Sequence, residues 1–294
     1  MAKTKSAFFC QNCGASAPKW IGKCANCGEW NTYVEEVIQQ GPSQVPAWRA
    51  SSSREDGGRQ AMPQLLGEIE PDKLTRINLP GKELNRVLGG GLVPGALVLV
   101  GGEPGIGKST LLLQLLGGAK GPSLYVTAEE SAQQVRLRAD RLGAISPDLW
   151  LLPEMSLPNI IAAIDKISPS LVVIDSIQTV VDPELGSSPG SVVQVRGCAH
   201  RLVQEAKRRN ISVVLVGHVT KEGGLAGPRV LEHVVDTVLS FEGERHNALR
   251  LMRAAKHRFG PTNELGLFEM TEAGLVGVPD ASQLFLTDRR TGVP

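Results

Sequence analysis

A glycine-rich phosphate-binding loop constrains the fold of this 294-residue chain more than any other feature. Residues 102–109 read Gly-Glu-Pro-Gly-Ile-Gly-Lys-Ser, a complete P-loop, and they follow the apolar run of residues 96–100. A P-loop joins a buried strand to the N-terminus of a helix, where backbone N–H groups point at phosphate oxygens. Residues 109–116 are predicted to form that helix. The alternative is a glycine-rich turn that matches by accident, but the flanking strand and helix favour a nucleotide-phosphate site.

The loop assigns chemistry to individual side chains. Lys108 is expected to reach the β- and γ-phosphate oxygens, and the hydroxyl of Ser109 to bind Mg²⁺. ATP is preferred over GTP because no Asn-Lys-x-Asp motif follows the loop, although no adenine pocket can be read from the sequence. The predicted nucleotide-binding residues are Gly102, Glu103, Pro104, Gly105, Ile106, Gly107, Lys108, Ser109 and Thr110.

Short apolar runs alternate with amphipathic stretches from about residue 64 onward, which predicts an α/β fold with a mostly parallel sheet and helices on both faces. Alternating patterns after residue 236 predict antiparallel strands that extend this sheet. The buried strands are expected at residues 96–100, 124–126, 149–152, 171–174 and 213–216, and the antiparallel strands at 236–242, 248–254 and 265–270.

Residues 191–209 predict an amphipathic crossover helix with one apolar stripe and a basic face. Such a face is most often simply solvated, and DNA contact is the alternative. The total charge does not decide between them, because the formal net charge is only +1. The basic side chains are Arg196, Arg201, Lys207, Arg208 and Arg209.

Four cysteines near the N-terminus form two Cys-x-x-Cys pairs, Cys10 with Cys13 and Cys24 with Cys27. This spacing predicts a closed, structural Zn²⁺ site in a small ribbon. A thioredoxin-like redox pair would need a single motif in a βαβ unit, and a disulfide framework would need an oxidising compartment. Lys19, Trp20, Lys23 and Trp30 are expected on the surface of the ribbon, to contact a partner protein or DNA, or merely to shield the metal.

The chain is expected to divide into a zinc ribbon at residues 1–36, a flexible linker at 37–63, an ATPase domain at 64–276 and an entry segment at 277–294. The linker is rich in Gly, Pro, Ser and charge, and has little apolar periodicity. No apolar run reaches the roughly 20 residues that span a bilayer, and no signal peptide pattern is present. We therefore expect a cytoplasmic protein without membrane contact.

Acidic residues follow two of the predicted strands. Asp175 ends the run 171–175 and is predicted to hold Mg²⁺ as a Walker B residue, the alternative being a plain acidic strand terminus. Glu129 is the first choice for orienting or deprotonating the attacking water, and Glu130 is the reserve. The charge of Glu130 could instead favour the N-terminus of the next helix.

His218 lies, by this interpretation, just past the end of the strand at 213–216. There it could sense the γ-phosphate and signal to the glycine-rich segment that follows. A neutral histidine packed in the protein interior is the alternative.

Taken together, the motifs resemble the bacterial RadA (Sms) family over essentially the whole chain. The resemblance rests on several segments. They are residues 10–14 and 18–24 of the ribbon, residues 89–95 before the P-loop strand, the P-loop itself, and residues 126–131, 175–179 and 217–223. KaiC and other RecA-superfamily proteins share some of these motifs. The resemblance implies a RecA-like ATPase that forms hexameric rings similar to DnaB helicases. It also implies binding to single-stranded and branched DNA and branch migration in recombination and repair alongside a RecA-type recombinase.

The resemblance also assigns roles outside the P-loop. The family signature Lys-Asn-Arg-Phe-Gly falls on residues 256–260, with His257 in place of Asn. Lys256 and Arg258 are thus implied to reach the γ-phosphate of a neighbouring subunit, the alternative being surface charge at a strand end. DNA is implied to contact channel loops at 178–190 and 220–229, the first acidic and flexible. The second carries Lys221 and Arg229.

Two functions remain open. One is a DNA-dependent ATP motor, a helicase or branch-migration enzyme. The other is a KaiC-like nucleotide-switched module, in which ATP binding determines the oligomeric state and the ribbon recruits a partner. The family normally continues into a Lon-protease-like domain. The sequence is therefore interpreted as stopping where that domain would begin.

Overall fold

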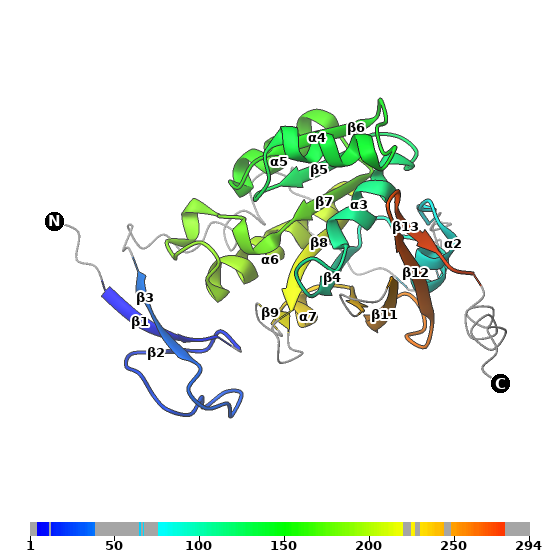
Figure 1. The fold of residues 1–294 in the computed structure, drawn as a ribbon. Helices are drawn as coiled ribbons and strands as arrows, with labels where there is room; N and C mark the ends of the chain where they lie inside the picture. Colours follow the sequence, from blue (N-terminus) through cyan, green and yellow to red (C-terminus); the bar gives the residue numbers. More distant parts are fainter. Residues whose placement is uncertain are drawn as a thin grey trace, which may run out of the picture.

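The computed structural model describes two sheets, a small one near the N-terminus and a large one flanked by helices (Figure 1). Among the described helices, none is long and apolar enough to cross a bilayer. The structure describes residues 5–11, 13–38, 65, 67, 76–219, 225–226, 230–243 and 248–279.

The small sheet has three strands in the order β2-β1-β3, and both pairings are antiparallel. These strands are β1 (Lys5–Cys10), β2 (Ser16–Ala17) and β3 (Tyr33–Ile38). The third strand extends two residues into the segment predicted as a linker, and residues 39–63 lie outside the described part of the chain.

The large sheet has the strand order β13-β12-β11-β10-β4-β8-β7-β5-β6, with the short strand β9 paired to β8. The strands from β10 to β6 in this order are parallel to their neighbours. All five apolar runs predicted as strands are confirmed. They are β4 (Leu97–Gly102), β5 (Ser123–Thr127), β6 (Leu149–Pro153), β7 (Leu171–Asp175) and β8 (Ser212–Val219).

The antiparallel extension differs from prediction at its first strand. Strand β10 pairs in parallel with β4 and is antiparallel only to β11. Helix α7 lies between β8 and β10, and such a crossover lets the next strand enter in the same direction. The later strands are antiparallel, as predicted, and a short last strand was not predicted. The elements are β9 (Leu225–Ala226), α7 (Val230–Val234), β10 (Thr237–Glu242), β11 (Leu249–His257), β12 (Leu265–Thr271) and β13 (Gly274–Gly277).

Helices cover both faces of the large sheet, as the sequence predicted. Side chains of β4 show why, because Val98 and Val100 pack into one apolar cluster and Leu97 and Leu99 into the other. The first cluster includes residues of α2, α3 and α4, and the second includes residues of α5, α6 and α7. These helices are α2 (Lys82–Val87), α3 (Lys108–Gly117), α4 (Ala132–Arg141), α5 (Leu157–Ile167) and α6 (Val192–Arg209).

The predicted helix at 191–209 is confirmed as α6. It begins after Ser191, whose side chain accepts a hydrogen bond from the amide of Gln194, and it ends at Asn210 in the left-handed conformation. Three of its basic side chains are paired, since Arg201 contacts Asp182, Arg208 contacts Glu205 and Arg209 contacts Asp165.

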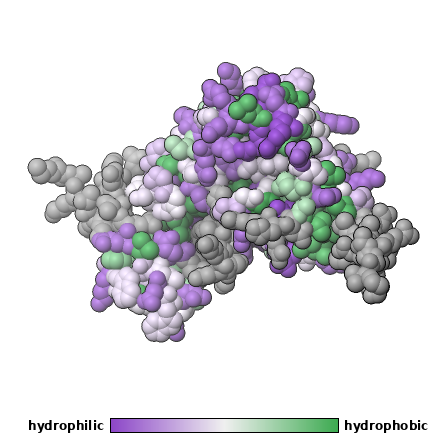
Figure 2. All heavy atoms as spheres, viewed as in Figure 1, coloured by the Kyte–Doolittle hydropathy of each residue, from purple (hydrophilic) through white to green (hydrophobic). Residues whose placement is uncertain are grey.

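Hydrophilic side chains gather at the top of Figure 2, where Figure 1 places α4, α5 and β6.

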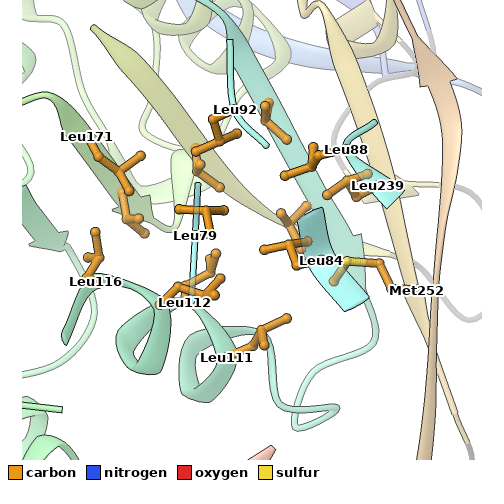
Figure 3. A pocket seen from close by; sticks show the side chains of 15 residues that line it. Leu79, Leu84, Leu88, Leu92, Leu111, Leu112, Leu116, Leu171, Leu239 and Met252 are labelled. Carbon is orange, nitrogen blue, oxygen red and sulfur yellow. The ribbon is translucent and has the colours of Figure 1, made fainter. Parts of the chain in front are cut away.

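The first cluster contains a small cavity of about 20 Å³ (Figure 3). Fifteen apolar side chains line it, among them Leu79, Leu112, Leu116, Leu171 and Met252. A cavity of this size with no polar lining offers a water molecule no hydrogen-bond partner, so we expect it to stay dry.

Candidate nucleotide and zinc sites

The P-loop and the predicted acidic residues meet at one edge of the large sheet. Strand β4 leads into the P-loop, β5 ends two residues before Glu129, and β7 ends at Asp175. The strands are in register, because Leu215 of β8 is level with both Leu99 of β4 and Ile174 of β7. Carboxyl ends of parallel strands form the ligand edge of such sheets. The pairing pattern therefore brings together side chains that are far apart in sequence.

The P-loop turns where the backbone adopts conformations that favour glycine. Gly105 has φ of 80° and Gly107 has φ of 111°. A Cβ on Gly107 would lie 2.6 Å from Cε of Met270 in β12, so the loop also packs closely against the antiparallel extension. The predicted helix at 109–116 is confirmed as α3, which begins at Lys108. The amide groups of its first turn are those that bind phosphate in P-loop proteins.

Lys108 is buried within the loop, with 4% of its surface exposed. Its Nζ donates hydrogen bonds to the carbonyls of Gly102 at 2.7 Å and Glu103 at 2.9 Å. Desolvation lowers the pKa of Lys108, while the nearby charges of Asp175 and Glu129 act in the opposite direction. The ammonium group thus lies close to both carboxylates.

Asp175 is the last residue of β7 and accepts a hydrogen bond on Oδ2 from the hydroxyl of Tyr125, at 2.7 Å. Its carbonyl also accepts a hydrogen bond from the amide of Ala128, at 3.0 Å. The aspartate is therefore fixed to β5 through both its backbone and its side chain.

The two candidate glutamates have different partners. Oε1 of Glu129 accepts a hydrogen bond from the hydroxyl of Ser176 at 2.6 Å. Glu130 forms an ion pair with Arg138 of α4 through both carboxylate oxygens, and its amide is hydrogen-bonded to the hydroxyl of Thr127. Glu129 thus contacts the residue that follows β7, and the charge of Glu130 is paired with Arg138.

The side chains at this edge suit Mg²⁺. Hydroxyl and carboxylate oxygens are the hard ligands that this ion prefers, and it commonly keeps several waters when protein carboxylates bind it. Ser109 and Asp175 offer such oxygens, and Ser109 is partly exposed at the first turn of α3. Bound Mg²⁺ would neutralise charge on the phosphate oxygens.

The four ribbon cysteines converge on one point, with ligand atoms all within 4.8 Å of one another. Sγ of Cys10 lies 3.6 Å from Sγ of Cys27, and Sγ of Cys13 lies 3.5 Å from Sγ of Cys24. A tetrahedral ion with bonds of about 2.3 Å separates its sulfur ligands by roughly 3.8 Å. The arrangement fits Zn²⁺ with no ligand position left for a substrate.

Neighbouring hydroxyl groups contact two of these sulfurs. The hydroxyl of Thr32 lies 3.1 Å from Sγ of Cys10, and that of Tyr33 lies 3.5 Å from Sγ of Cys24. Hydrogen bonds from the backbone of Cys27 and from Tyr33 lower the pKa of Cys24 to about 6, which favours the thiolate. After each second cysteine, Gly14 and Gly28 have positive φ of 74° and 76°.

Known families match both parts of the chain. The family described as "AAA domain" matches residues 66–224, more than half of the chain. The chain belongs to the AAA domain family. The family described as "Rubredoxin metal binding domain" matches residues 8–35, which contain all four cysteines of the zinc site.

Several curated proteins named DNA repair protein RadA resemble this AAA-domain chain over nearly its full length. The protein from Bacillus subtilis is 52% identical over 99% of this chain and 64% of its own length. Those from Halalkalibacterium halodurans and Pseudomonas aeruginosa are 51% identical over 100% of this chain and 64% of their own length. The resemblance to the bacterial RadA family is confirmed, and the chain spans about 64% of the length of these relatives.

Lys256 and Arg258 are anchored within the chain beyond the matched part of the AAA domain. Nζ of Lys256 donates to the carbonyls of Glu232 and Val235 at the end of α7. Arg258 pairs with the buried carboxylate of Asp236 at 3.1 Å. Both lie at the end of β11. This position is compatible with contact to the γ-phosphate of a neighbouring subunit and also with plain surface charge at a strand end.

The remaining predicted residues have mixed outcomes. The prediction that His218 lies just past its strand is wrong, because β8 continues to Val219 and His218 pairs with Gly102; the side chain of His218 lies outside the described residues. Lys221 and Arg229 also lie outside them. The prediction of a flexible segment at 178–190 is wrong as well. Two short helices occupy it, η3 (Ile177–Thr179) and η4 (Pro183–Leu185).

The order of this segment comes from buried polar contacts. The side chain of Gln194 donates to the carbonyls of Asp182 and Ser187, both at 3.0 Å, and accepts from the amide of Asp182 at 2.9 Å. The carboxylate of Asp182 pairs with Arg201 of α6. These contacts are long-range, so no local pattern in the sequence could indicate them.

Sequence reasoning missed three residues next to the nucleotide site: Tyr125, Ser176 and Arg138. Tyr125 is the aromatic residue of β5, between Leu124 and Val126, which was the available signal. Ser176 directly follows Asp175, but its contact with Glu129 depends on the pairing of β5 with β7. Cys198 is buried in the second cluster, and burial raises its pKa to about 12.

Proposed function

We propose that this chain is a Mg²⁺-dependent ATPase whose hydrolysis drives movement along DNA during recombination and repair. The observation that carries the ATPase proposal is that β4, β5 and β7 end at one edge of the sheet, so Asp175 and Glu129 lie at the edge that holds the P-loop and Lys108. The DNA part is supported by 52% identity to a relative named DNA repair protein RadA.

Each group at the sheet edge has a proposed task. Lys108 exchanges its two carbonyl acceptors for phosphate oxygens when ATP binds. Ser109 and Asp175 hold Mg²⁺, the latter through water. Glu129, which is exposed at this edge and accepts a hydrogen bond from Ser176, orients or deprotonates the attacking water. Glu130 has its charge paired with Arg138 and is assigned a structural role.

We further propose that subunits form a ring, hexameric in the resembled family, that binds single-stranded and branched DNA and acts with a RecA-type recombinase. Lys256 and Arg258 then reach the nucleotide of the neighbouring subunit, where cations stabilise charge in the transition state. Lys221 and Arg229 track DNA phosphates without sequence preference, a mode that weakens steeply with salt. The zinc ribbon is proposed to contact a partner or DNA.

The first experiment measures steady-state ATPase rate with and without single-stranded DNA, over a range of salt concentrations. We expect stimulation by DNA that falls as salt rises, and loss of activity in Lys108→Ala. Lys120→Ala is the matched control, because Lys120 is exposed beyond the C-terminal end of α3. A rate unaffected by DNA, with nucleotide binding intact, would contradict the motor and favour the nucleotide-switched module.

A mixing experiment tests the contact between subunits. Lys108→Ala inactivates its own site but keeps Lys256, whereas Lys256→Ala keeps its own P-loop. If Lys256 acts on the neighbour, mixed oligomers regain activity that neither variant has alone, because some interfaces then hold both lysines. No recovery in oligomers of normal size, checked by sedimentation, would place the action of Lys256 within its own subunit.

A further inference from the structure

Tyr125 is a buried polar residue at the nucleotide edge to which the proposed mechanism gives no task. It lies in the middle of β5 with 1% of its surface exposed, and its ring packs in the first apolar cluster together with residues of α3. Its hydroxyl donates to Oδ2 of Asp175 at 2.7 Å. Its acceptor is thus the carboxylate proposed to hold Mg²⁺.

The register of the sheet explains this reach. Tyr125 is level with Val173, and Asp175 lies two residues further along the neighbouring strand. Diagonal neighbours of this kind on one face are within reach of an aromatic side chain, but not of a short one. Tyrosine at this position can therefore bond the end of β7 from within the core.

The hydroxyl is fixed as a donor. A phenol is protonated at neutral pH and the carboxylate of Asp175 can only accept, so the Tyr125 hydroxyl donates this hydrogen bond. Arg138 and Glu130, whose charges also act on this hydroxyl, are paired with each other. Asp175 thus has one oxygen held by a neutral, immobile donor.

We propose that Tyr125 is a positioning residue of the magnesium site, where its hydroxyl holds one oxygen of Asp175 and leaves the other, Oδ1, for the magnesium-bound water. This inference rests on the proposed role of Asp175. Preorganised ligands of this kind strengthen metal binding, and loss of an outer-shell partner typically weakens affinity by 10- to 100-fold at tightly held metals. Mg²⁺ bound through water should show a smaller change.

The test uses Tyr125→Phe, which removes the hydroxyl and keeps the ring. Binding of a fluorescent ATP analogue to the full chain is measured as Mg²⁺ is titrated, and again in excess EDTA. We expect the Mg²⁺ concentration for half-maximal binding to rise about 3- to 10-fold, on the scale of outer-shell effects, with the metal-free affinity unchanged. Ser212→Ala is the matched control, because it removes another buried hydroxyl, bonded to the carbonyl of Val93 at the opposite end of the strands.

Asp175→Asn separates the inference from the proposal beneath it. If Asp175→Asn weakens the Mg²⁺ dependence and Tyr125→Phe does not, the role of Tyr125 is overturned and that of Asp175 stands. If Asp175→Asn has no effect on the Mg²⁺ dependence of binding, the proposed metal role of Asp175 is contradicted, and the inference about Tyr125 loses its basis.

A second measurement does not depend on the folding of a variant. The chain has two tyrosines, Tyr33 and Tyr125, so 3-fluorotyrosine labelling gives two ¹⁹F resonances. Titration of Mg²⁺ with ATP bound should shift the Tyr125 resonance and leave that of Tyr33 in place. A Tyr125 resonance that does not respond to Mg²⁺ would overturn the inference.

Discussion

The zinc ribbon and the AAA core achieve stability in opposite ways. Among the described residues of the ribbon, the buried apolar cluster consists of Cys10, Ala17, Cys24 and Tyr33, and half of these residues are metal ligands. The AAA core instead has two large clusters of aliphatic side chains, one on each face of its sheet. A segment of about 30 residues buries too little surface to fold by apolar contact alone. The metal therefore takes the place of an apolar core in the ribbon, whereas apolar packing stabilises the AAA core.

The placement of aromatic residues repeats this contrast. In the ribbon, Trp20 and Trp30 are mostly exposed, and Nζ of Lys23 lies 5.5 Å from the ring centroid of Trp30. In the core, Tyr125 and Phe241 are among the largest fully buried side chains. The largest apolar side chains of the ribbon thus contribute little to its folding, which leaves them available for contact with other molecules.

Removal of zinc should give the largest effect and separate the two regions most clearly. We expect a chelator, or Cys24→Ser, to unfold the ribbon while the AAA core stays folded, because a structural zinc contributes about 10–16 kcal/mol to such folds. Limited proteolysis followed by mass spectrometry would detect cleavage confined to residues 5–38.

Thiol alkylation supplies the control for this experiment. Cys198 is buried in the core, and its raised pKa of about 12 keeps it a thiol, so it should stay unreactive at neutral pH. The four ribbon cysteines should become reactive once zinc is removed. Modification of Cys198 on chelation would mean that the core also depends on the metal.

A leucine truncation tests the apolar half of the contrast. Leu116→Ala removes a side chain that is 1% exposed and lines the cavity in Figure 3, and alanine is compatible with a helix. We expect a loss of about 2–5 kcal/mol in the free energy of unfolding of the core, measured in urea. Zinc content should not change.

Leu137→Ala is the matched control for this truncation. Leu137 also lies in a helix, but 72% of its surface is exposed, so its removal should cost less than about 0.5 kcal/mol. Equal losses in the two variants would contradict the claim that packing around the cavity stabilises the core.

A buried carboxylate tests how far the core also relies on polar contacts. Asp236 accepts a hydrogen bond from the amide of Leu97 and pairs with Arg258. Asp236→Ala leaves that amide without its acceptor and should cost about 1–3 kcal/mol in the free energy of unfolding. Asp236→Asn keeps an acceptor and should cost less, because Arg258 is half exposed and its ion pair is weakened by solvent. Equal costs would assign the effect to charge.

The zinc ligands, the P-loop and the buried strands could be predicted from the sequence because each is a local pattern. The Cys-x-x-Cys spacing places two sulfurs on one turn, and an apolar run before a P-loop is a strand in almost any context. The parallel direction of β10 was not predictable in this way, since it depends on the crossover through α7.

The contacts that distinguish the acidic residues were also beyond the sequence. Glu129 and Glu130 are adjacent and chemically alike, and only the fold assigns Ser176 to one and Arg138 to the other. Likewise, Tyr125 and Asp175 are 50 residues apart, and the pairing of β5 with β7 joins them.

Acidification should have the smallest of these effects on the free energy of unfolding of the core, and it should act through His257. Burial lowers the pKa of His257 below its usual value, and its Nδ1 lies 2.8 Å from the hydroxyl of Thr237. Because the unfolded chain then binds a proton more readily than the folded one, the core loses stability as pH falls through the ordinary histidine range. His257→Asn should make the free energy of unfolding flatter between pH 7 and pH 5, whereas His200→Asn, at an exposed position on α6, should not. If the free energy of unfolding of His257→Asn kept the same pH profile, the acid sensitivity of the protein would be assigned to the ribbon instead, where protons compete with zinc for the thiolates.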